Sequence, residues 1–73
     1  MKFAINDAVI VRYTGIRDYE YARVVAVDTT GVAYARTSSY GRLRSSEDCC
    51  TFRRIGTYRP SLFGWKLVHF LEK

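Results

Sequence analysis

Short runs of β-branched and aromatic residues, each bounded by turn-forming residues, constrain this chain most strongly. The first run covers residues 8–13, begins after Asn6-Asp7 and stops at Thr14-Gly15. Val, Ile and Tyr favour strands, whereas Asn, Asp and Gly favour turns. The pattern therefore predicts a β-strand over 8–13.

A second and a third run of the same kind lie close together in the sequence. Residues 16–21 are mixed polar and aromatic and predict a loop, after which 22–27 and 32–36 have strand composition. Four residues, 28–31, separate these two runs and end in Gly31, which can take the positive φ that hairpin loops commonly need. We expect a β-hairpin here.

The pattern weakens after Arg36. Residues 37–41 predict a loop. Ser45 and Asp48 have the spacing of a helix capping box, with aspartate in place of the preferred glutamate, so a short helical turn can start there.

The last third of the chain predicts two further strands. Residues 51–55 can form a short strand closed by Gly56, and residues 59–61, with a central proline, should break the chain again. Residues 65–71 alternate at period two. A short terminal helix remains an alternative, but the aromatic and β-branched content favours a strand.

The 73 residues are long enough for one domain, 1–73, with a small core. These elements predict a mainly β fold, a small and strongly bent antiparallel sheet with at most a short helical turn. The apolar residues expected in the core are Val9, Val11, Val24, Val25, Val27, Val32, Phe52, Trp65, Leu67 and Phe70. Some of them can instead belong to an exposed strand edge that pairs with an extended peptide.

The opening third of the chain adds a resemblance in fold. The succession Asp7-x-Val9-x-Val11, Ala22-Arg23-Val24 and Asp28-x-x-Gly31-Val32 resembles the start of SH3-like barrels of the KOW and Tudor kind. The resemblance implies that the sheet closes into such a barrel.

The net charge of +5 is confined to the second half of the chain. Residues 1–35 carry four basic and four acidic side chains, whereas residues 36–73 carry eight basic and three acidic ones. Like charges held together on a fold repel one another unless a partner neutralises them. The skew therefore indicates an anionic partner.

Tyrosines are interspersed among the arginines of this basic half. Such residues can neutralise phosphates while stacking on bases, and they are also the types enriched at protein interfaces. The alternative is that they are scattered, solvated arginines with tyrosine rings in the core. The candidate partner-binding residues are Arg36, Tyr40, Arg42, Arg44, Arg53, Arg54, Tyr58 and Arg59.

The sequence offers little for catalysis, metals or cofactors. His69 is the lone histidine, and we expect it to pack within the last strand or at its rim. Cys49 and Cys50 are adjacent, so a disulfide between them could not join distant segments of the chain. They also lack the second pair of cysteines that a CxxC-type zinc site requires. We therefore expect two free thiols, no catalytic residues, no metal site and no cofactor.

Over its full length the chain resembles small RNA-polymerase-binding transcription regulators of Xanthomonas-infecting lytic phages. The stretches that carry the resemblance are 1–7, Tyr19-Glu20-Tyr21 and 65–70. It implies binding to the N-terminal part of the β′ subunit of host RNA polymerase, inhibition of initiation by promoting loss of σ, and suppression of intrinsic termination. No motif transfers binding residues one by one.

Together these observations predict a non-catalytic protein that acts by binding a partner. We expect a monomer in the cytoplasm of an infected bacterium, with host RNA polymerase as partner and contact with nucleic acid in the transcription complex. We expect no membrane partner, because no apolar run is long enough for a signal peptide or a membrane span. The alternatives are a small basic nucleic-acid-binding domain and an inhibitor of some other host enzyme.

Overall fold

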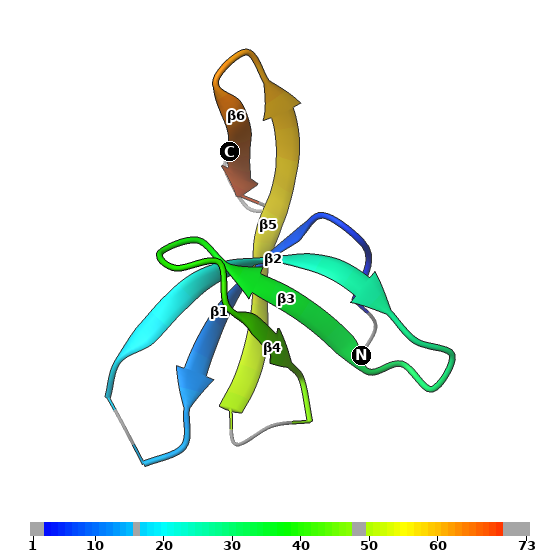
Figure 1. The fold of residues 1–73 in the computed structure, drawn as a ribbon, viewed down its shortest axis with the longest axis vertical. Helices are drawn as coiled ribbons and strands as arrows, with labels where there is room; N and C mark the ends of the chain where they lie inside the picture. Colours follow the sequence, from blue (N-terminus) through cyan, green and yellow to red (C-terminus); the bar gives the residue numbers. More distant parts are fainter. Residues whose placement is uncertain (1–2, 16, 48–49, 70–73) are drawn as a thin grey trace.

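The computed structural model describes residues 3–15, 17–47 and 50–69. Within them the regular structure is one antiparallel sheet with strand order β4-β3-β2-β1-β5-β6 and no helix, which confirms the predicted mainly β fold (Figure 1). The strands are β1 (Asp7–Tyr13), β2 (Tyr19–Val27), β3 (Ala33–Thr37), β4 (Leu43–Ser45), β5 (Cys50–Ser61) and β6 (Gly64–His69).

The core lies on one face of this sheet. Successive strand residues point to opposite faces, so alternate positions of β1, β2 and β3 gather on one side. The small apolar side chains there are fully buried; they are Val9, Val11, Ala22, Val24, Ala33 and Ala35. Phe3 and Phe52 close one side of this cluster, with an edge-to-face contact at 5.8 Å between ring centroids.

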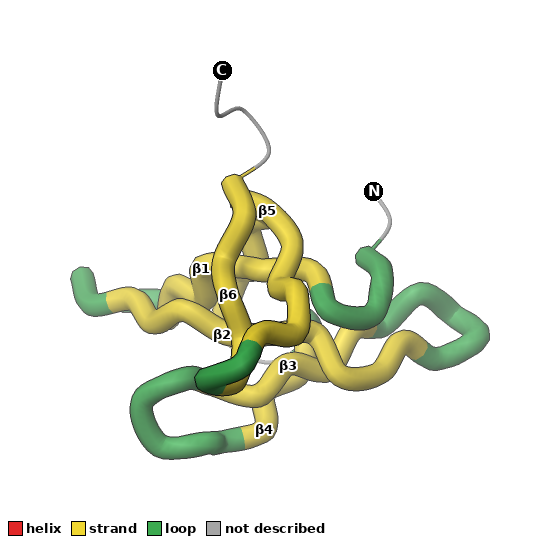
Figure 2. Tube along the Cα trace, turned by 90° about the horizontal axis from the view of Figure 1, so that it is seen from above, coloured by secondary structure: helices red, strands yellow, loops and turns green. Residues whose placement is uncertain are grey.

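The sheet bends strongly over this core, as predicted. Arg44 of β4 lies over the Tyr13 ring of β1 at 5.4 Å, although two strands separate β4 from β1 in the sheet order. Figure 2, which looks down on the sheet from above, shows that its strands do not lie in one plane.

The sheet does not close into a barrel, so the expected SH3-like closure is wrong. Within the described residues β4 pairs only with β3, and β5 pairs with β1 and β6. The reason lies in β5, whose second half leaves the sheet body and forms a projecting hairpin with β6 (Figure 1). β4 is only three residues long, so it offers a short edge for backbone pairing with β5.

Two boundaries in β5 also differ from the sequence-based prediction. The strand continues through Gly56 and Pro60 instead of ending at each. Pro60 is tolerated because it lies near the end of a hairpin strand, opposite Trp65, where few ladder hydrogen bonds are required. Gly56, which pairs with Ala8 on one side and His69 on the other, is required because a Cβ there would collide with the Val68 backbone carbonyl.

Of the remaining local predictions, some are confirmed and others are wrong. β1 and the 28–31 hairpin are confirmed, with Gly31 at φ 94°. The predicted tail strand corresponds to β6 as far as His69; Phe70 and Leu71 lie outside the described residues. β2 begins at Tyr19, inside the segment predicted as a loop. Ser45 ends strand β4 and its Oγ accepts a hydrogen bond from the Glu47 amide at 3.1 Å, so a turn stands where a helical turn was expected; Asp48 lies outside the described residues.

A partly buried ion pair joins β1 to β5. Asp7 Oδ2 lies 3.0 Å from Arg54 Nε, with the aspartate side chain 5% and the arginine side chain 33% exposed. The same oxygen accepts a hydrogen bond from the Ala4 amide at 2.8 Å. Arg54 therefore compensates a carboxylate that the fold withdraws from water.

We expect Arg54→Met to lower the free energy of unfolding by about 2 kcal/mol, because it leaves the Asp7 carboxylate buried without its guanidinium. Arg53→Met is the matched control, since Arg53 is the exposed neighbour and its loss should change stability by less than about 0.5 kcal/mol. Urea unfolding of both variants measures the difference. Equal destabilisation would show that the ion pair contributes nothing specific.

Candidate partner-binding surface

The face of the sheet opposite the core carries exposed tyrosines and arginines. Along β2 the inward residues Ala22 and Val24 alternate with Tyr19, Tyr21 and Arg23, which therefore point outward. The strand register continues this pattern across the sheet and places Arg23 directly opposite Arg36 of β3.

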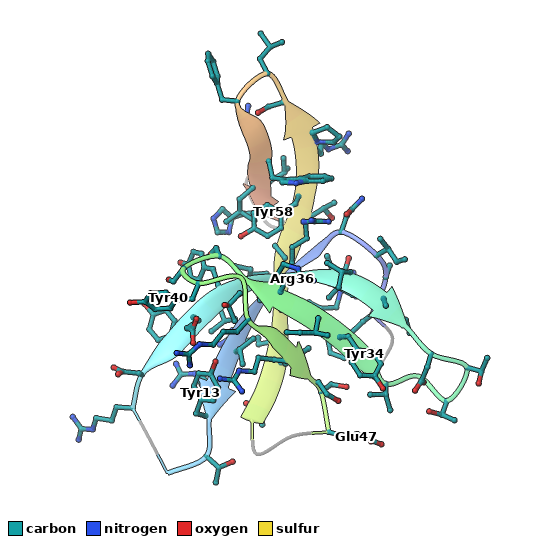
Figure 3. All side chains as sticks on the ribbon, in the orientation of Figure 1. Tyr13, Tyr34, Arg36, Tyr40, Glu47 and Tyr58 are labelled. Atoms are coloured by element: carbon teal, nitrogen blue, oxygen red, sulfur yellow. The ribbon has the colours of Figure 1, made fainter. Side chains whose placement is uncertain are left out.

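A cavity of about 300 Å³ lies where the β5–β6 hairpin rises from this face. Its lining residues include two arginines and two aromatic residues; they are Arg23, Arg36, Thr37, Ser38, Tyr58 and Trp65. Trp65 lies close over Arg23, with the guanidinium carbon 4.1 Å from the ring centroid. Figure 3 shows Arg36 at the foot of the hairpin with Tyr58 above it.

A row of rings leads away from this cavity along β2. Tyr19 and Tyr21 stack at 6.2 Å between centroids with 25° between their planes, and Arg12 of β1 lies over the Tyr19 ring at 5.7 Å. We call the whole surface the arginine–aromatic face; it comprises Arg12, Tyr19, Tyr21, Arg23, Arg36, Tyr58 and Trp65.

The two cavity arginines are held by neutral acceptors. Arg23 donates a hydrogen bond to the Asn6 side-chain carbonyl at 3.0 Å, and Arg36 donates one to the Gly41 backbone carbonyl at 2.8 Å. Among the described residues neither forms an ion pair with a carboxylate. Both guanidiniums are thus fixed in place while their charge remains available to an anion.

Tyr58 is partly buried beside these groups. Burial raises the pKa of its phenol above the ordinary value of 10.0; the nearby Tyr21 adds to the rise and Arg23 opposes it. The Tyr58 hydroxyl is consequently neutral at physiological pH and can donate a hydrogen bond into the cavity.

This pKa shift gives the fold a dependence on alkaline pH. Because folded Tyr58 keeps a proton that the unfolded chain releases, its contribution is complete below pH 10.0 and is lost as the pH rises through the higher folded-state value. We expect the free energy of unfolding to decline above pH 10.0, and to decline less steeply in Tyr58→Phe. Denaturant unfolding across this range checks it; identical declines would contradict the assignment.

The tip of the β5–β6 hairpin is a second exposed feature. Its turn residues Leu62 and Phe63 are 96% and 98% exposed, and the Phe63 amide donates a hydrogen bond to Ser61 Oγ at 3.3 Å. Figure 1 shows this turn at the far end of the hairpin, away from the rest of the sheet. Two large apolar side chains are thus presented to solvent at a projecting point.

The structure brings some of the predicted site residues together. Arg36 and Tyr58 line the same cavity. Tyr40 lies in the turn that follows β3, and Arg42 lies just after it, with its guanidinium over the Tyr40 ring at 5.4 Å. The Arg36 side chain donates a hydrogen bond to the Gly41 carbonyl between them. These four side chains belong to one region of the surface.

The other four predicted residues lie outside this region. Arg44 is half-buried against Tyr13 on the inner side, and Arg54 forms the ion pair with Asp7. Arg53 is exposed on β5 and pairs in register with Ile10, the partner of Tyr21, so it lies on the same outer face of the sheet but outside the cavity lining. Arg59 is exposed on the hairpin directly opposite Lys66, whereas the cavity residue Trp65 pairs with Pro60.

Sequence reasoning missed Arg12, Tyr19, Tyr21, Arg23 and Trp65 as site residues. The alternation of Tyr19, Tyr21 and Arg23 at period two was a usable signal, obscured by the predicted loop over 16–21. Trp65 was expected in the core, but 46% of it is exposed and its ring contacts Arg23. That expectation is wrong because β6 leaves the sheet with the hairpin and does not cover the core.

The described residues contain no cluster of three or more His, Cys, Asp or Glu side chains suited to a metal ion. The two cysteines are not among these residues, because Cys49 and the side chain of Cys50 lie outside the described part of the chain. His69 is exposed at the end of β6, at its rim. Among the same residues, no helix is long and apolar enough to span a membrane.

Comparison with known protein families, with curated proteins and with solved structures finds no match for this chain.

Proposed function

We propose that this protein is a non-catalytic adaptor that binds bacterial RNA polymerase. The hairpin tip carries the proposal. Leu62 and Phe63 are nearly fully exposed on a projecting turn, and large apolar side chains presented in this way are typical of contacts with another protein. A protein partner with an apolar pocket removes both side chains from water.

The charge distribution supports a large anionic partner. The chain carries a net charge of +5, and the arginines of the outer face lack carboxylate partners among the described residues. A polymerase holding nucleic acid attracts such a surface over long range, which raises the association rate at low salt. The tip then supplies the short-range contact.

The resemblance to phage regulators supplies the identity of the partner. It implies the N-terminal region of the β′ subunit as the docking site. The proposed consequences are inhibition of initiation through loss of σ and suppression of intrinsic termination, both exerted in the cytoplasm of the infected host.

Size-exclusion chromatography of the purified protein with polymerase core tests the proposal. We expect co-elution near physiological ionic strength and weaker association at about 1 M salt, where charges are screened within about 3 Å. Added to holoenzyme, the protein should release σ into a separate peak. If no complex forms even at low salt, the proposed function is wrong.

A further inference from the structure

The arginine–aromatic face has the composition and geometry of a nucleic-acid-binding surface, separate from the hairpin tip. Its cations are fixed: Arg23 is held by Asn6 and Arg36 by Gly41, both through neutral oxygens. Cations that the fold positions but does not neutralise are suited to phosphate oxygens.

No acid opposes them on this face among the described residues. The Glu20 carboxylate points to the other side, where it accepts a hydrogen bond from Tyr13 at 2.7 Å. Asp7 is paired with Arg54, and Asp28 is engaged by the amides of its own turn. Asp18 and Glu47 lie in loops. An approaching phosphate backbone therefore meets uncompensated positive charge.

The aromatic side chains provide flat surfaces next to these charges. Tyr19 and Tyr21 stand two residues apart on one strand, a spacing of about 6.6 Å, and their rings are 25° from parallel. The cavity beside them adds Tyr58 and Trp65. Rings repeated along a strand, with arginines beside them, form the kind of platform on which successive unpaired bases stack.

We infer that the arginine–aromatic face binds single-stranded RNA, with bases stacked on Tyr19, Tyr21 and Trp65 and phosphates at Arg12, Arg23 and Arg36. Stacking requires exposed base faces, which a duplex hides. The choice of RNA over single-stranded DNA rests on the proposed function, since a polymerase delivers single-stranded RNA. Ser38 supports the choice: it is a lining residue of the cavity, and its hydroxyl, which donates to the Tyr21 carbonyl at 3.0 Å, can also accept a hydrogen bond from a ribose 2′-OH.

Fluorescence anisotropy with labelled oligouridine of about 12 nucleotides, using purified protein without polymerase, tests this inference. We expect binding that weakens as salt rises, weaker binding of oligothymidine of equal length, and much weaker binding of an RNA duplex. Tyr21→Ala should weaken RNA binding about tenfold through lost stacking. Arg36→Gln should weaken it and reduce the salt slope by about 0.7, the value for one phosphate contact on a single strand.

Arg59→Gln is the matched control, because it removes one exposed positive charge from the hairpin strand at a position outside the cavity lining. It should leave RNA affinity within about twofold. Equal losses for Arg36→Gln and Arg59→Gln would mean non-specific charge attraction and would overturn the site. Absence of RNA binding, equal binding of the duplex, or tighter binding of oligothymidine would also overturn the inference. In each of these cases co-elution with polymerase would be unaffected, so failure here is distinguishable from failure of the proposed function.

Discussion

Replacing both tip residues, Leu62→Ser with Phe63→Ser, should reduce affinity for polymerase core at least about 30-fold. Buried apolar anchors at the centre of a protein interface typically contribute about 2 kcal/mol or more when truncated, which corresponds to that factor. Both side chains are nearly fully exposed in the free protein, so the unfolding transition should be unchanged. Titration of labelled protein with polymerase core measures the affinity.

The control for the tip is Leu43→Ser. Leu43 is also an exposed leucine, 54% accessible, but it lies on β4 and not on the hairpin. It should retain wild-type affinity for polymerase. If Leu43→Ser weakens binding as much as the tip double variant, general surface hydrophobicity rather than the tip is responsible.

Gly56→Ala should destabilise the protein by about 3 kcal/mol, the upper part of the usual range for overpacking. A Cβ added at Gly56 would collide with the backbone carbonyl oxygen of Val68 and approach the Cα of His69 at 2.9 Å. Because these are backbone atoms, no side-chain rotation relieves the clash. The hairpin must separate, or β5 must shift against β1.

Hydrogen exchange distinguishes the two responses to Gly56→Ala. We expect the amides of β6 to lose protection while those of β1 and β2 keep it. Gly31→Ala is the comparison: apart from its chain neighbours, no heavy atom of the described residues lies within 4 Å of the added Cβ, so only the strain of a positive φ is introduced, about 1 kcal/mol. A Gly56→Ala variant as stable as Gly31→Ala would show that the hairpin does not pack as described.

The parts of the fold that depend on residues close together in the sequence could be predicted. The β-branched run of β1 and the glycine of the β2–β3 turn express local preferences, and both appear where expected. β5 could not be predicted in this way. Gly56 and Pro60 have turn propensity locally, but pairing with β1 on one side and β6 on the other keeps the strand extended through both.

The candidate surface was predictable only in part, for a related reason. Arg36 and Tyr58 stood out by residue type, whereas Arg23 was hidden in a half of the chain whose charges sum to zero. Folding separates those charges, since Glu20 points to the inner side while Arg23 points outward to Trp65. The contact between Arg23 and Trp65 joins distant segments and depends on how the hairpin rises from the sheet, which no local pattern encodes.

A photo-crosslinking amino acid at position 63 tests most directly whether the hairpin tip docks on polymerase. Phe63 is replaced by its benzophenone analogue, the protein is mixed with purified polymerase core and illuminated, and the crosslinked peptide is identified by mass spectrometry. The same group at Thr29, an exposed turn position between β2 and β3, is the control. We expect position 63 to crosslink to the N-terminal region of β′ and position 29 not to. No crosslink from position 63, or equal labelling from both positions, would contradict docking through the tip.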